Sequence, residues 1–66
     1  MRSVGYEAKS RILEIEFDSG AVYQYLDVPL RTYEELRAAE SMGRYFNGEI
    51  RDSFPYVQVG QSRGAG

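Results

Sequence analysis

The chain has 66 residues, enough for one small domain with a marginal core. It contains neither Cys nor His, which excludes disulfides, Cys–His zinc sites, a histidine general base and a cysteine nucleophile. Its formal net charge of −2, from 10 acidic and 8 basic side chains, lacks the basic excess that nucleic-acid-binding domains usually carry.

Aromatic rings and arginines stand out in the composition. Tyr and Phe make up 14% of the chain, so a few rings can supply most of a small core. Seven of the eight basic residues are Arg, which suits bidentate phosphate or carboxylate recognition but also follows from genomic base composition. Residues 1–5 lack the apolar core of a signal peptide, and no stretch is long and apolar enough to span a membrane, so we expect a soluble cytoplasmic protein.

The first half of the chain predicts antiparallel strands. Residues 3–6 form a short first strand, residues 7–10 a turn, and residues 11–17 the clearest strand. In the last of these, apolar and acidic side chains alternate as they do in a half-buried strand. The apolar set is Leu13, Ile15 and Phe17, and the acidic set is Glu14 and Glu16.

The loop at residues 18–20 sets the register of the returning strand, residues 21–26. A three-residue loop ending in a left-handed Gly20 places Tyr23 and Tyr25 opposite apolar residues. Both tyrosines then lie on the apolar face, whereas a two-residue loop would turn them to the solvent. The expected cross-strand pairs are Phe17 with Ala21, Ile15 with Tyr23, and Leu13 with Tyr25.

Two helical segments are expected after the strands. The first runs from Pro29 to about Glu40, with a buried stripe at Tyr33, Leu36 and Ala39. Ser41 caps the second, residues 42–51. Its apolar side holds Met42, Phe46 and Ile50, and its polar side holds Arg44, Asn47 and Arg51.

The dipeptide Asn47-Gly48 conflicts with the second helix. It is a strong hairpin signal, and Gly weakens a helix, so a break near Gly48 is the alternative. Residues 56–59 are expected as a last strand or an extended tail, and residues 60–66 as a disordered tail. The resulting fold class is α+β: a single domain over residues 1–59, with a small antiparallel sheet of three or four strands and two helical segments packed on one face.

A longer string of residues resembles the KTSC domain, a module found at the C-terminus of some lysyl-tRNA synthetases and as short stand-alone bacterial and phage-type proteins. The resemblance covers about residues 3 to 56, and the family's hallmark Tyr-x-Tyr matches Tyr23-Gln24-Tyr25. The synthetase context implies RNA binding, and no catalytic residues come with the family. The matching positions continue through Val28-Pro29 and Gly43-x-Tyr45-Phe46-Asn47 to Ile50-Arg51.

The residues themselves argue against catalysis. Glu14 and Glu16 share the outward face of a strand, about 7 Å apart, but a domain this small has little room for the closed, dry cleft that acid–base catalysis needs. The sequence has no catalytic triad, phosphate-binding glycine loop or metal-ligand cluster. We therefore expect a non-catalytic binding module without a cofactor or a metal.

RNA is the first expected partner. Single-stranded nucleic-acid binders combine aromatic platforms with Arg or Lys, and Tyr23 and Tyr25 have the spacing of such platforms. The same spacing buries both rings under helices, and the register favours burial. The contact surface is then the polar side of the second helix. The candidate binding residues are Arg44, Tyr45, Asn47, Arg51, Tyr23 and Tyr25.

A protein partner, or a second copy of the chain, is the alternative. A small sheet has edge strands that can recruit another strand, and self-association would compensate for a small core. We place RNA ahead of protein, and expect neither a membrane nor a small-molecule cofactor as partner.

Overall fold

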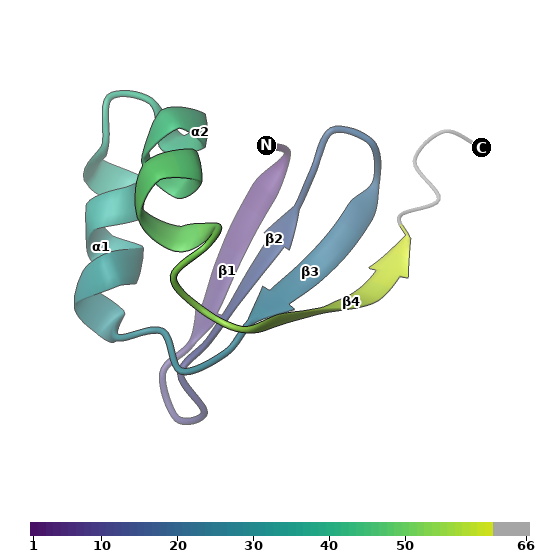
Figure 1. The fold of residues 1–66 in the computed structure, drawn as a ribbon, viewed down its shortest axis with the longest axis horizontal. Helices are drawn as coiled ribbons and strands as arrows, with labels where there is room; N and C mark the ends of the chain where they lie inside the picture. Colours follow the sequence, from purple (N-terminus) through teal and green to yellow (C-terminus); the bar gives the residue numbers. More distant parts are fainter. Residues whose placement is uncertain (62–66) are drawn as a thin grey trace.

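Four antiparallel strands form one sheet in the order β1-β2-β3-β4 in the computed structural model, which describes residues 1–61 (Figure 1). Each strand pairs with its neighbours in the sequence, and the helical segments are inserted between β3 and β4. The α+β prediction is confirmed, with four strands. They are β1 Ser3–Glu7, β2 Ile12–Glu16, β3 Ala21–Tyr25 and β4 Tyr56–Gln61.

The β2–β3 hairpin has the predicted register. Leu13 lies opposite Tyr25 and Ile15 opposite Tyr23, while Phe17 N–H donates to the Ala21 carbonyl at 2.9 Å. The loop closes on Gly20, whose φ of 95° is one that L side chains rarely adopt. The three-residue loop thus turns the central tyrosines toward the helical side of the sheet.

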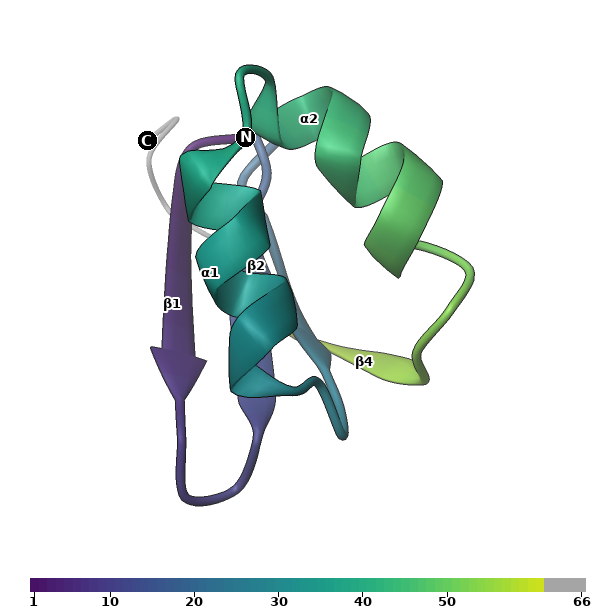
Figure 2. The same cartoon turned by 90° about the vertical axis from the view of Figure 1, so that its left-hand side faces the viewer.

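Helix α1, Leu30–Ala38, lies over β1 and β2 (Figure 2). It buries Leu36 completely, and its half-buried Tyr33 stacks on Tyr6 of β1 with ring centroids 5.0 Å apart. The Tyr6 hydroxyl donates a hydrogen bond of 2.6 Å to the carbonyl of the buried Val28. Tyr6 therefore links strand β1, at one edge of the sheet, both to α1 and to the connection that precedes it.

The second helical segment changes its winding midway. It begins as α2, Met42–Tyr45, where the Ser41 side chain accepts from the Arg44 N–H, and continues as a π-helical turn, η1, Phe46–Ile50. The Arg51 N–H donates to the Phe46 carbonyl five residues earlier, at 2.9 Å. The chain stays helical across Asn47 and Gly48 by widening its turn, so it makes neither the hairpin nor the break.

The core lies between β2, β3 and the helical segments. Among residues 1–61 the buried side chains come from these elements and from the β3–α1 connection; they are Leu13, Ile15, Tyr25, Val28, Leu36, Phe46 and Ile50. The predicted buried sides of both helical segments are confirmed at Leu36, Phe46 and Ile50. Only Tyr33, Ala39 and Met42, at the margins of these stripes, stay partly exposed.

Strand β4 runs two residues beyond the expected boundary of the domain. Gly60 and Gln61, assigned by composition to a disordered tail, pair with Val22 and Ala21 of β3. A register shift between Val22 and Tyr23 introduces a bulge, where a glycine is readily accommodated. The rest of the expected tail, residues 62–66, lies outside the described residues.

Candidate functional site

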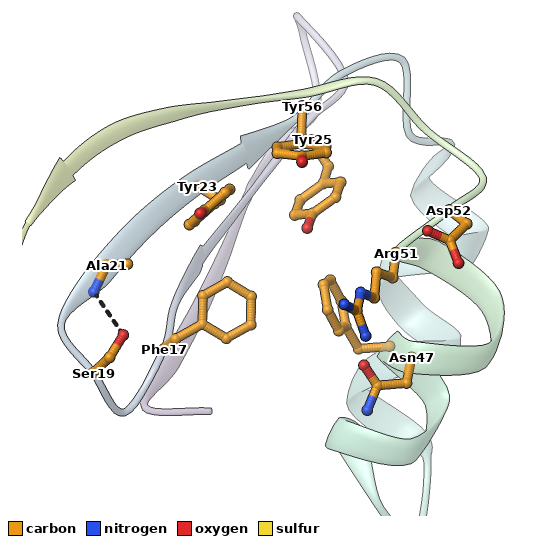
Figure 3. A pocket seen from close by; sticks show the side chains of 10 residues that line it. Phe17, Ser19, Ala21, Tyr23, Tyr25, Asn47, Arg51, Asp52 and Tyr56 are labelled. Atoms are coloured by element: carbon orange, nitrogen blue, oxygen red, sulfur yellow. Dashed lines mark hydrogen bonds between the residues drawn. The ribbon is translucent and has the colours of Figure 1, made fainter.

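A cleft of about 500 Å³ separates the β3–β4 part of the sheet from the end of the second helical segment (Figure 3). In Figure 3, Phe17 and Tyr23 face Asn47 and Arg51 across the gap, and the Tyr25 hydroxyl points between them. Strands, hairpin loop and helix each contribute to its lining. The lining residues are Phe17, Ser19, Ala21, Tyr23, Tyr25, Phe46, Asn47, Arg51, Asp52 and Tyr56.

Five aromatic rings form a connected cluster along the cleft. Tyr56 contacts both Tyr23 and Tyr25, with centroids 5.4 and 5.3 Å apart. Phe46 meets Phe17 and Tyr25 edge-on, at 5.4 and 5.3 Å. Because each ring is held by at least two others or by the core, the cluster is a preformed surface.

The exposure of these rings is graded from the core outward. Tyr25 is 4% exposed and Tyr23 is half-buried, whereas Tyr56 is 54% exposed. The predicted burial of the central tyrosines therefore holds for Tyr25 and only partly for Tyr23. The reason is that the helical segments cover β2 and the end of β3 but do not reach β4, so the apolar face stays open there (Figure 1).

Three polar side chains of the cleft, those of Tyr25, Asn47 and Arg51, are not engaged with other described residues. Within residues 1–61, no ion pair or hydrogen bond holds the Arg51 guanidinium, the Asn47 amide or the Tyr25 hydroxyl. Burial raises the pKa of Tyr25, the nearby Tyr56 and Tyr23 raise it further, and Arg51 opposes them. The phenol therefore stays protonated at neutral pH and can donate a hydrogen bond into the cleft.

The structure divides the predicted binding residues into two groups. Tyr23, Tyr25, Asn47 and Arg51 line the cleft. Arg44 and Tyr45 line a separate, shallower depression of about 260 Å³ with Gly48 and Glu49. The π-helical turn lies between Arg44 and Arg51, so these arginines do not share the single polar side that regular α-helical geometry gives them.

Tyr45 is engaged within the helical layer. Its hydroxyl donates to the Glu35 carboxylate of α1 at 2.6 Å, and this bond raises the pKa of Tyr45 to about 12.

The predicted set of binding residues omitted Phe17 and Tyr56, which also line the cleft. The pairing of Phe17 with Ala21 could have placed Phe17 beside Tyr23, whereas Tyr56 becomes recognisable only once β4 is paired with β3.

The carboxylates lie away from the cleft, apart from Asp52. Glu14 accepts from the Gln24 amide at 3.0 Å on the outer face of the sheet, and Glu16 pairs with Arg2 at 3.1 Å. Residues 1–61 contain no group of three acidic side chains that could hold a metal ion. No helix in this part of the chain is long and apolar enough to cross a membrane.

The fold and the cleft define a small α+β domain with an aromatic groove at one end of its sheet. The KTSC domain model matches residues 1–54, and the chain belongs to the KTSC domain family. The crystal structure of the KTSC domain protein YPO2434 from Yersinia pestis superposes with a TM-score of 0.85 at 41% identity, covering 88% of this chain and 82% of that one. The family predicted from the sequence is thus confirmed.

Relatives of two sizes share this domain. A protein of Tsukamurella paurometabola is 39% identical over 59 residues, which cover 89% of this chain and 88% of that protein. The lysine–tRNA ligase of Trichormus variabilis is 48% identical over 54 residues, 82% of this chain. The chain spans only about a tenth of the length of that ligase, so the match concerns one appended module.

Proposed function

We propose that this domain is a non-catalytic RNA-binding module and that the aromatic cleft is its contact surface. The observation that carries the proposal is the combination, in one cleft, of a preformed aromatic cluster and an arginine with no partner among the described residues. Binders of unpaired RNA use this pair of features: bases stack on rings while arginine contacts the phosphates. The homologous segment in lysine–tRNA ligases supports RNA as the partner.

In this proposal each group of the cleft has a distinct role. Tyr56, which is 54% exposed, and the half-buried Tyr23 offer ring faces for stacking. Each stacked base contributes about 1–3 kcal/mol in such binders. Asn47 and the protonated Tyr25 hydroxyl supply donors and acceptors for base edges, and Arg51 supplies the positive charge. A volume of about 500 Å³ suits a short unpaired segment and is too small for a duplex.

Charge sets the expected strength of binding. The net charge is −2, and Arg51 is the one basic residue among those that line the cleft. A single phosphate contact on a single strand gives a slope of about −0.7 in log K against log salt concentration. We therefore expect weak binding, with a shallow salt dependence and a large contribution from stacking.

The test is an NMR titration of labelled protein with a short single-stranded RNA and with tRNA. Amide shifts should change around Tyr23, Asn47 and Arg51. Replacement Arg51→Ala should weaken binding about fivefold to tenfold, the size of a charge-assisted contact near a surface. Arg44→Ala is the matched control, because Arg44 lies on the same helical segment but outside the cleft.

Two results would overturn this proposal. One is the absence of shift changes at the cleft at millimolar concentrations of both partners. The other is equal weakening by Arg44→Ala and Arg51→Ala, since general electrostatic attraction would then explain the binding. Tyr56→Ala gives an independent check, because it removes a stacking face without changing the charge and should also weaken binding.

A further inference from the structure

Strand β4 is an open edge of the sheet with an unusual surface. Among residues 1–61 it pairs with β3 alone, so the outer N–H and C=O groups of β4 face no other described strand. Three of the four exposed large apolar side chains among residues 1–61 belong to this strand. They are Tyr56, Val57 and Val59, at 54%, 46% and 48% exposure, while Leu30 of α1, at 49%, is the fourth.

The two edges of the sheet differ in charge. Strand β1 ends in Glu7 and is flanked by Arg2, which pairs with Glu16 at 3.1 Å, while the terminal ammonium group pairs with Asp18 at 3.2 Å. Charged side chains of this kind protect an edge against pairing. Strand β4, Tyr56–Gln61, has no charged residue and no proline. Any strand addition is therefore directed to β4.

We propose that β4 pairs with β4 of a second copy of this chain, which gives a two-fold symmetric dimer with one continuous eight-stranded sheet. When two copies of the same strand pair antiparallel about a two-fold axis, any charged residue on the strand lies near the same residue of the other copy. Like charges would therefore repel each other across the pair. A strand without charges avoids this repulsion. The net charge of −2 adds little repulsion between whole domains.

This inference is independent of RNA binding. Val57 lies opposite Gln24 and Tyr56 opposite Tyr25, so Val57 projects to the face of the sheet away from the cleft. Six residues extend about 20 Å, and such a pairing buries less than the standard interface of about 1,200–2,000 Å². The dimer should accordingly be weak, with Kd of about 0.1–1 mM.

The test is sedimentation of the protein without RNA, from about 20 µM to about 2 mM, a range that brackets the expected Kd. The apparent mass should rise from 7.5 kDa toward twice that value. Val57→Lys places two like charges at the interface and should raise Kd more than about tenfold. Leu30→Lys is the matched control, because it removes the exposed apolar side chain that lies on α1 and should leave Kd unchanged.

Amide spectra of both variants check that the fold is retained. Intermolecular NOEs between labelled and unlabelled copies should fall on residues 56–61. A protein that stays monomeric up to about 2 mM, well above the expected Kd, would overturn the proposal. Equal weakening by Leu30→Lys and Val57→Lys would overturn it as well, since association would then not use β4. Neither result bears on the cleft, which is tested by RNA titration.

Discussion

The hydroxyls of two tyrosines in this domain are expected to have different roles, one in folding and one in binding. Replacing each tyrosine with phenylalanine should distinguish these roles. The Tyr6 hydroxyl donates a 2.6 Å hydrogen bond to the carbonyl of Val28, a fully buried residue. The Tyr25 hydroxyl has no hydrogen-bond partner among residues 1–61 and points into the cleft (Figure 3). We therefore expect Tyr6→Phe to lower the free energy of unfolding and Tyr25→Phe to lower the affinity for RNA.

The magnitudes follow from what each change removes. Tyr6→Phe keeps the ring that stacks on Tyr33 at 5.0 Å, so the loss is one hydrogen bond and the solvation of the Val28 carbonyl. That loss is about 1–2 kcal/mol in the free energy of unfolding, or a fall in Tm of about 4–16 °C for a domain this small. Tyr25→Phe removes a hydroxyl that contributes no protein contact, so the free energy of unfolding should change by less than about 0.5 kcal/mol.

Urea unfolding followed by circular dichroism measures the first effect, and RNA titration of the same variants measures the second. Tyr25→Phe should weaken RNA binding about threefold to tenfold, which corresponds to one lost hydrogen bond. Tyr6→Phe should bind normally under conditions where it is folded. A Tyr25→Phe variant destabilised as much as Tyr6→Phe would refute the reasoning, because its hydroxyl would then serve the fold.

Three further predictions concern the glycines, Tyr45 and β4. Gly48→Ala should raise the free energy of unfolding by about 0.5–1 kcal/mol, because an added Cβ meets nothing within 4 Å. Gly20→Ala should lower it by about 1–2 kcal/mol, because Gly20 has a φ of 95°. Urea unfolding of the two variants measures both changes. In an absorbance titration, Tyr45 should ionise near pH 12, and Tyr45→Phe should remove that step. Because the Glu35 hydrogen bond raises the pKa of folded Tyr45 above the ordinary tyrosine value of about 10, the stability from this bond is present below pH 10 and lost as pH rises toward 12. A chain shortened to residues 1–55 should still fold in amide spectra, because every buried apolar residue among 1–61 precedes β4, but it should lose both RNA binding and dimerisation; an unfolded product would contradict this account of the core.

The hairpin was predictable because local chemistry determines it. The loop length and Gly20 fix which residues face each other, and the alternation of Leu13 and Ile15 with glutamates fixes which face is buried. Helix faces were predictable for the same reason, since the apolar positions Phe46 and Ile50 repeat at helical spacing. These features depend on neighbours in the sequence.

The composition of the cleft was less predictable because it depends on two non-local features. Regular α-helical spacing places Arg44 and Arg51 on one side, and only the π-helical turn at Phe46–Ile50 separates them. Tyr56 joins Tyr23 and Tyr25 only when β4 returns to pair with β3 after about thirty intervening residues. The prediction of a disordered tail was wrong at Gly60 and Gln61 for the same reason. Composition describes residues in isolation, whereas pairing with β3 orders these two residues.

The position of the helical segments in the chain accounts for both the cleft and the free edge. A sheet built from β1 to β3 alone would be covered by α1 and by the second helical segment, which contact Tyr6, Phe17 and Tyr25. Strand β4 is added after those segments, on the far side of β3, where no helix covers it (Figure 1). Its inward Tyr56 therefore extends the apolar face into an open groove, and its outer backbone has no neighbouring strand among residues 1–61. One short strand thus contributes to both proposed surfaces, the cleft and the pairing edge, and mutations at Tyr56 and Val57 can test the two separately.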